Sequence, residues 1–160
     1  MITPLPMPIS PFLSLTLHNG QPLDIPASSV VTVEQLNDDE KTATPGARSG
    51  VFFDLGNGPQ AVLVVQPFPK LEKEIAPALA GAALVLERPN GCKVLLRKSN
   101  IRGIMGLPDG DAKCQVSHQV GPRTLGCNVI NTRDEIMAQI APPAPQEVPT
   151  NASETDAPQG

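Results

Sequence analysis

The sequence has very few aromatic residues. It contains no Trp, no Tyr and only four Phe among its 160 residues, so any core must be built from Val, Leu and Ile. No apolar run approaches the roughly 18 continuous residues of a membrane-spanning helix. The first twelve residues, MITPLPMPISPF, carry no positive charge and are broken by prolines, unlike a secretory signal. We therefore expect a chain located in the cytoplasm or in a virion, with no membrane partner.

Cysteine is scarce and unevenly placed. Cys92, Cys114 and Cys127 all lie in the second half of the chain, and an odd number argues against a disulfide framework. Cys114, His118 and Cys127 could form a zinc site only with Cys92 or His18 as a fourth ligand, and their spacing is not that of structural zinc. We expect reduced thiols packed as small apolar side chains, with no metal and no other cofactor.

Catalytic patterns are also missing. A thiol nucleophile needs an oriented base, and the candidates are Cys92 or Cys127 with His118, but no Gly-rich elbow or helix start follows either cysteine. Both histidines lie near expected turns, where solvation is the ordinary outcome. The segments GARSG and GNGPQ lack the ending of a phosphate loop. The acidic segments 37–40 and 109–111 lack the spacing of an EF-hand. We expect no catalytic residues and no enzyme.

A segment that occurs twice organises the chain. LTLHNGQPLDIPASSVVTV, which starts at Leu15, returns as LVLERPNGCKVLLRKSNIRGI, which starts at Leu84. An offset of about 71 positions aligns Asn19-Gly20 with Asn90-Gly91 without a gap. In both copies Asn-Gly separates two runs of alternating apolar residues, which is a strong hairpin signal. So many matches in one register indicate a tandem duplication.

The repeat predicts a mainly β fold of two tandem modules. Each has four to five antiparallel strands followed by a short helix, in residues 13–80 and 81–141. In the first helix Leu71 and Ile75 share one face, and Pro77 is expected to end the helix. The second helix begins with the capping-box spacing of Thr132 and Glu135. The polar, turn-rich segment 37–50 is expected to be a loop.

Both ends of the chain are rich in proline. Residues 1–12 form an expected Pro-rich arm, and residues 142–160 an expected disordered tail with too few apolar groups to fold. A lone module of about 60 residues would bury only about 60% of its unfolded surface. We therefore expect the two modules to pack against each other, edge to edge or face to face.

The order of strand, Asn-Gly turn, strand, Ser or Asn with Ile, strand, hairpin and short helix resembles the small bacterial flagellar-operon protein FlbD and similar small β-domains. The resemblance covers most of each module, but neither the 37–50 segment nor the Pro-rich ends. It implies a small β-fold used for binding, with no catalytic residues to carry over. The residues that carry it are Asn90-Gly91, Val94, Leu96, Asn100-Ile101, Ile104, Val116, Val129, Glu135-Ile136 and Ile140.

Charge separates the two modules. Residues 13–77 carry four basic and eight acidic side chains, whereas residues 83–141 carry eight basic and five acidic ones. Such modules attract each other, or prefer different partners. Phe52-Phe53 places one ring on each face of a strand, so one ring should be core and the other should need a cover. The candidate interface residues are Phe12, Phe52, Phe53, Arg97, Lys98 and Arg102.

Two functions remain open at this point. The first is a non-enzymatic structural, assembly or adaptor protein, for example a capsid or decoration component of a virion, whose partners are proteins: copies of itself or a larger protein array. The alternative is a small nucleic-acid-binding regulator that uses the basic second module through Arg97, Lys98 and Arg102. Phosphate contacts would favour that cluster, but the module has no aromatic residue on which a base could stack.

Overall fold

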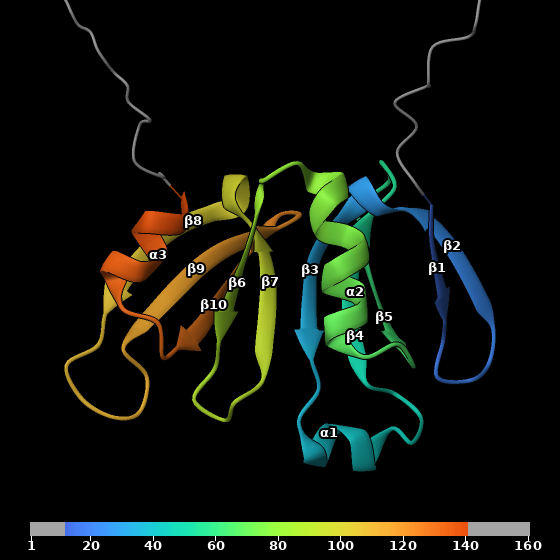
Figure 1. The fold of residues 1–160 in the computed structure, drawn as a ribbon, viewed down its shortest axis with the longest axis horizontal. Helices are drawn as coiled ribbons and strands as arrows, with labels where there is room; N and C mark the ends of the chain where they lie inside the picture. The colour runs from blue at the N-terminus through green and yellow to red at the C-terminus, as the bar shows by residue number, and fades with distance from the viewer. Residues whose placement is uncertain (1–11, 141–160) are drawn as a thin grey trace, which may run out of the picture.

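A computed structural model describes residues 12–140, which form ten strands and short helices (Figure 1). The strands pair antiparallel throughout, so the predicted mainly β class is confirmed. The predictions for the Pro-rich arm and the disordered tail fall on residues 1–11 and 141–160, outside the described residues. No helix within residues 12–140 is long and apolar enough to span a membrane.

The elements follow one another in short, closely spaced segments. The strands are β1 Phe12–Thr16, β2 Pro22–Pro26, β3 Val30–Gln35, β4 Ser49–Asp54, β5 Pro59–Val64, β6 Ala83–Glu87, β7 Lys93–Arg97, β8 Ile101–Gly106, β9 Cys114–Val120 and β10 Arg123–Val129. The α-helices are α1 Asp38–Ala43, α2 Phe68–Ile75 and α3 Arg133–Ile140. The 3-10 helices are η1 Ala27–Ser29, η2 Ala76–Leu79 and η3 Lys98–Asn100.

The central sheet contains strands from both halves of the chain. Its order is β5-β4-β3-β7-β6, and the smaller sheets are β1-β2 and β10-β9-β8. The two halves meet edge to edge where β3 pairs with β7. The partners there are Thr32 with Leu96, Val33 with Leu95, and Glu34 with Val94. The boundary between modules at residue 80 stays a prediction.

The two predicted Asn-Gly hairpins form with the same local geometry. Asn19 accepts the backbone N–H two residues further on at 3.0 Å, and Asn90 does the same at 2.9 Å. Gly20 and Gly91 have φ values of 90° and 88°, a region that favours glycine. Each side chain therefore fixes its own turn, and the turn sets the register of the strands beside it.

The strand after each 3-10 helix contains a bulge at matching positions. The pairing of β3 with β4 shifts register between Val30 and Thr32, and that of β8 with β9 shifts between Ile101 and Gly103. These positions are 71 residues apart, like the two hairpins. The order of hairpin, 3-10 helix, three strands and α-helix therefore occurs in both 12–75 and 83–140, with α1 as an insertion in the first.

In each half a backbone hydrogen bond joins the end of the first strand to the residue that follows the last strand. The backbone N–H of Val65 donates to the carbonyl of Thr16 at 2.9 Å, and that of Ile130 donates to the carbonyl of Glu87 at 2.8 Å. Thr16 and Glu87 keep the offset of 71, whereas Val65 and Ile130 are 65 positions apart, because the connection between β8 and β9 is shorter than that between β3 and β4. These bonds reach only the ends of the strands, so β5 and β10 keep β4 and β9 as their single partners in the sheets.

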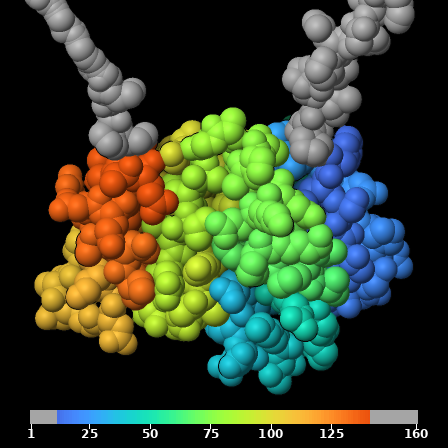
Figure 2. Space-filling view, in the orientation of Figure 1, coloured from blue at the N-terminus to red at the C-terminus, as the bar shows by residue number. Residues whose placement is uncertain are grey.

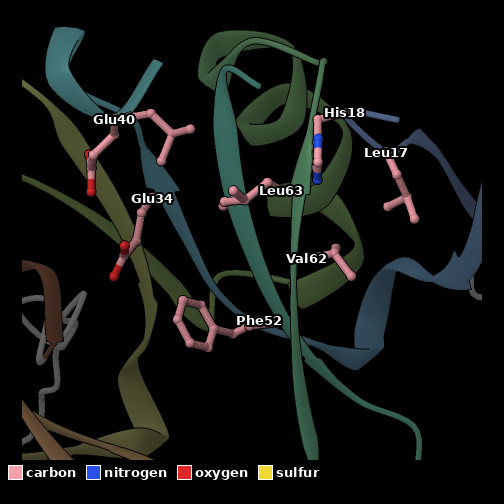
Figure 3. Close-up of a pocket in the computed structure, with 10 residues that line it drawn as sticks. Leu17, His18, Glu34, Glu40, Phe52, Val62 and Leu63 are labelled. Carbon is pink, nitrogen blue, oxygen red and sulfur yellow. The ribbon is translucent and has the colours of Figure 1, made fainter. Parts of the chain in front are cut away.

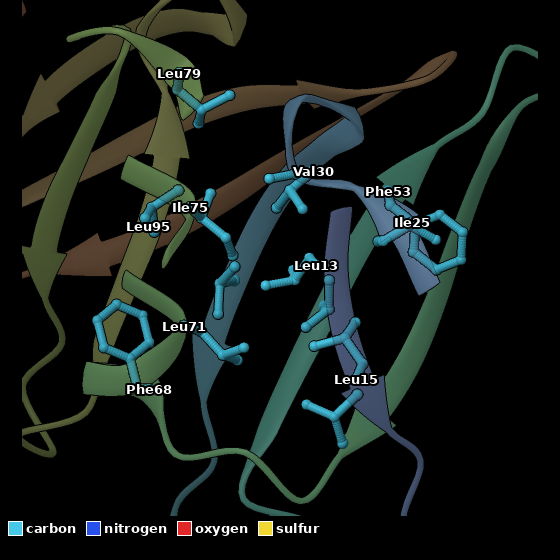
Figure 4. Close-up of a cluster of buried hydrophobic side chains, with 14 residues drawn as sticks. Leu13, Leu15, Ile25, Val30, Phe53, Phe68, Leu71, Ile75, Leu79 and Leu95 are labelled. Carbon is cyan, nitrogen blue, oxygen red and sulfur yellow. The ribbon is translucent and has the colours of Figure 1, made fainter. Parts of the chain in front are cut away.

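Two apolar cores lie on either side of β7. The first combines β1 to β5 and α2 with Leu95 of β7 (Figure 4). The second lies between β6-β7 and β9-β10 and includes Ile136 of α3. Leu95 and Leu96 are adjacent and point to opposite faces of the strand, so β7 contributes to both cores. Leu71 and Ile75 are both fully buried, which confirms the predicted face of α2.

The segment 37–50, predicted to be a loop, contains a helix. In α1 the side chain of Asn37 accepts from the N–H of Glu40 at 2.8 Å, and the side chain of Glu40 accepts from the N–H of Asn37 at 2.9 Å. This capping box stabilises a helix that buries none of its residues. The Asn-x-x-Glu spacing was the signal that the polar composition obscured.

The ends of the other helices match their sequence signals more closely. The predicted capping box of α3 is confirmed, since Thr132 and Glu135 exchange hydrogen bonds of 2.7 and 3.2 Å. The α-helix α2 ends at Ile75, but the chain continues through Pro77 as the 3-10 helix η2. Pro77 is tolerated there because it occupies the first turn of that helix, where its missing N–H needs no partner.

Candidate functional site

The three phenylalanines among the candidate interface residues have different environments. Phe12 is 64% exposed at the start of β1, whereas Phe53 is 2% exposed and belongs to the first core. Phe52 is half-buried and lines a small cavity together with Val120 and Leu125 of the second half. The ring of Phe53 is therefore core, the ring of Phe52 lies near the second half, and Phe12 is the exposed member of the three.

The basic candidates surround the 3-10 helix η3. Arg97 ends β7 and Lys98 begins η3, and both are half-buried, while Arg102 is exposed in β8. Arg102 donates to the carbonyl of Ser99 at 2.7 Å and to the side chain of Gln119 at 3.1 Å. The fold brings the three basic residues to one turn, but it also engages the guanidinium of Arg102 internally.

An ion pair crosses the junction between the halves. Arg88 lies 3.1 Å from Glu34, and the two side chains are only 23% and 26% exposed. Burial opposes the charge of Arg88, but Glu34 and Cys127 outweigh it and raise the pKa of the guanidinium. Arg88 belongs to the second half of the chain. Its partner lies in the other half of the chain, so no local pattern could have revealed the pair.

His118 is buried, contrary to the expectation of a solvated residue near a turn. It is 4% exposed and lies in β9, where alternate residues Cys114, Val116, His118 and Val120 all point inward. Its Nδ1 atom has no hydrogen-bond partner among the described residues. Burial and then the nearby charge of Arg88 lower the pKa of His118 below 6.5. The imidazole is therefore held in its neutral form.

The cysteines serve as small apolar residues, as the sequence predicted. Cys92, Cys114 and Cys127 are free and buried, and the last two belong to the second core. Burial raises the pKa of Cys92, which keeps it a thiol instead of a reactive thiolate. Within residues 12–140, no group of three His, Cys, Asp or Glu side chains is arranged to hold a metal ion.

Acid is expected to destabilise the protein through His118. Because its pKa is lowered in the folded chain, the unfolded chain binds the proton more readily, so stability is full above pH 6.5 and falls as the pH drops below that value. Urea unfolding between pH 7.5 and 5 would measure this loss. His118→Phe should reduce it. An unchanged pH dependence in His118→Phe would contradict this assignment.

An apolar cavity of about 400 Å³ lies beside the first half (Figure 3). Leu17, Val62 and Leu63 supply apolar surface, and Glu34 and Glu40 lie towards one side. A cavity of about 490 Å³ in the second half has a mixed polar and apolar lining instead. Its residues are Arg88, Pro89, Asn90, Gln115, Gly126, Cys127 and Asn128. Neither cavity combines a nucleophile with an oriented base.

Six strands within residues 12–140 have a single partner in the sheets, namely β1, β2, β5, β6, β8 and β10. β2 pairs with β1 alone, and β8 pairs with β9 alone. The edge of β8 is also apolar, with half-buried Ile101 and Ile104 and with Met105 that is 54% exposed. An unpaired edge offers free backbone donors and acceptors to another strand, and β2 and β8 each have one.

No protein-family model, curated protein or solved structure matches this chain.

Proposed function

We propose that this chain is a non-enzymatic structural or adaptor protein that assembles with other protein chains through its open strand edges. The observation that carries the proposal is the β8 edge, where free backbone groups lie beside Ile101, Ile104 and exposed Met105. Such an edge favours strand addition, because backbone hydrogen bonds and apolar burial then act together. Exposed Phe12 at the opposite hairpin adds a second apolar contact point.

We also propose that the two halves are tandem copies of one module. The support is the common offset between Asn19 and Asn90 and between the bulges of β3 and β8, together with the repeated order of elements. In the first half β3 is covered by β7, whereas its counterpart β8 has no such neighbour. The edge that β3 uses to pair with β7 in the first module is therefore open on β8 in the second module, where another chain can bind.

The assembly that suits this chain best is a repeating protein array, and a virus or phage particle is the one we favour. Repeating arrays reuse one contact many times, which two different open edges on one chain permit. The assembly function is tested with the purified full-length chain, by light scattering and sedimentation velocity over a hundredfold concentration range. The mass should rise above that of one chain. A constant monomer that also binds no particle component would contradict the proposal.

A nucleic-acid-binding regulator is the second candidate, favoured by the position of Arg97, Lys98 and Arg102 around one turn. Filter binding of DNA and RNA at two salt concentrations separates the two functions. A regulator should lose affinity steeply with salt, and Arg97→Glu should abolish binding. We expect weak binding that Arg97→Glu changes little, because Arg102 is already engaged with Ser99 and Gln119.

A further inference from the structure

We propose that copies of this chain join head to tail, with the open edge of β8 in one copy pairing antiparallel with the open edge of β2 in the next. This deepens the proposed function and rests on it. The pattern for the contact is already present inside the chain, where β3 of the first half pairs with β7 of the second. β8 is the counterpart of β3 and β2 is the counterpart of β7, each 71 positions away.

The register follows from the internal contact. Inside the chain Val33 faces Leu95 and Glu34 faces Val94. Applying the same pairing between copies places Ile104 opposite Asp24 and Met105 opposite Leu23. The new contact would extend the three-stranded sheet β10-β9-β8 with β2-β1 of the next copy, giving five strands like the central sheet.

The two open edges lie towards opposite ends of the molecule. In Figure 1 the β1-β2 hairpin lies at one end of the long axis, and β8 and α3 lie at the other. The space-filling view shows the same separation between the blue hairpin and the orange α3 (Figure 2). One copy can therefore use both edges at once. Because the two surfaces differ, the assembly is a ring if it closes and a filament if it does not.

The β8 edge lacks the apolar cover that its counterpart has. In the first half Val33 and Ile75 are fully buried, and Leu95 of β7 packs in the same core (Figure 4). Their counterparts in the second half, Ile104 and Ile140, remain half-buried. A strand added at β8 would cover part of this apolar surface, which would favour association, although Asp24 would stand where β7 has Leu95.

The ion pair across the internal contact becomes an apolar pair at the open edges. Arg88 and Glu34 lie 3.1 Å apart where β3 meets β7. The counterpart of Glu34 is Met105, and the counterpart of Arg88 is Leu17. Both charged residues of the internal contact therefore correspond to apolar residues at the open edges, so neither edge presents an unpaired charge at these positions. Met105, 54% exposed in a single copy, would gain an apolar neighbour in the next copy.

A second hydrogen bond of the internal contact has neither its donor nor its acceptor at the counterpart positions of the open edges. The backbone N–H of Lys93 donates to the side chain of Gln35 at 2.8 Å. The counterpart of Lys93 is Pro22, which has no N–H, and the counterpart of Gln35 is Gly106, which has no side chain. The proposed contact therefore lacks the donor on β2 and the acceptor on β8, so no polar group is left unsatisfied there.

Charge makes the contact selective. Asp24 stands where the internal contact has Leu95, and an exposed acid beside Pro22 discourages indiscriminate strand pairing. The acidic first half and the basic second half also attract each other between copies.

Cross-linking tests the strand pair directly. Full-length Leu23→Cys and Met105→Cys chains are mixed and mildly oxidised, with the wild type as control because its three cysteines are buried. We expect a dimer that requires both variants, since opposed strand residues lie within disulfide reach. A dimer formed by Met105→Cys alone would indicate a symmetric β8-β8 contact and overturn the proposal.

Two charge changes test the same contact without cross-links. Met105→Asp should weaken self-association by about tenfold or more, because it places a charge in the contact and near Asp24. Asp24→Leu, which copies Leu95, should strengthen self-association by a similar factor. Leu55→Asp is the matched control, since Leu55 is also exposed at 52% but lies outside both edges. If the wild type assembles and both edge variants assemble equally well, this pairing is wrong but the proposed function stands. If the wild type is a monomer, the proposed function is wrong as well.

Discussion

Replacing Leu95 with Ala is expected to destabilise the whole described fold by about 2–5 kcal/mol, because it leaves a cavity in a packed core. Leu95 is fully buried, and although it belongs to the second half of the chain, it packs in the first core. Leu95 lies in β7, the strand that pairs with β3 and so joins the two halves. The loss should therefore reach both halves, and the variant should unfold in one transition at a lower urea concentration.

Urea unfolding followed by circular dichroism would measure the change. Leu55→Ala is the matched control, because Leu55 is 52% exposed and its truncation should change stability by less than about 0.5 kcal/mol. Two separate transitions in Leu95→Ala, with only one of them shifted, would contradict the idea that β7 couples the cores.

Replacing Glu34 with Met should destabilise the fold by about 1–3 kcal/mol, because it leaves Arg88 poorly solvated and without its carboxylate. The pair is 3.1 Å apart and three-quarters buried. The double variant Glu34→Met, Arg88→Leu should recover most of the loss, since it installs the residues found at the counterpart positions, Met105 and Leu17. Replacing a buried ion pair by apolar residues of similar size is often neutral.

A double-mutant cycle with both single variants and the double variant gives the coupling energy. We expect the two losses to be strongly non-additive. Lys70 and Glu74 form the matched control, because their ion pair is also direct, at 2.8 Å, but is well exposed. Removing it should cost at most about 1 kcal/mol. Equal losses in the two pairs would mean that the junction ion pair is no more important than a surface pair.

Local features of the fold were predictable from the sequence. The Asn-Gly turns at Asn19 and Asn90, the buried face of α2 and the capping box at Thr132 all arise from residues close together in the chain. These signals act over two to four residues, where turn geometry and helix periodicity decide the outcome. The α1 helix has the same kind of local signal, a capping box, but the polar, acidic composition of its segment favoured a loop.

Long-range features were not predictable in the same way. The pairing of Val33 with Leu95, the ion pair of Arg88 with Glu34 and the burial of His118 all depend on which strands become neighbours. A repeat in the sequence gives the order of the strands, but not which edge of one copy meets the other. The open edge of β8, which carries the candidate site, is a property of that arrangement and of no single segment.

The placement of Leu95 in the first core has a consequence during synthesis. The ribosome releases β1 to α2 before β7 exists, so the nascent first half has both an incomplete core and an unpaired β3 edge. Until β7 emerges, that edge is exposed to any neighbouring strand on the same polysome. We therefore expect chaperones to engage this chain most strongly in the interval between translation of α2 and translation of β7.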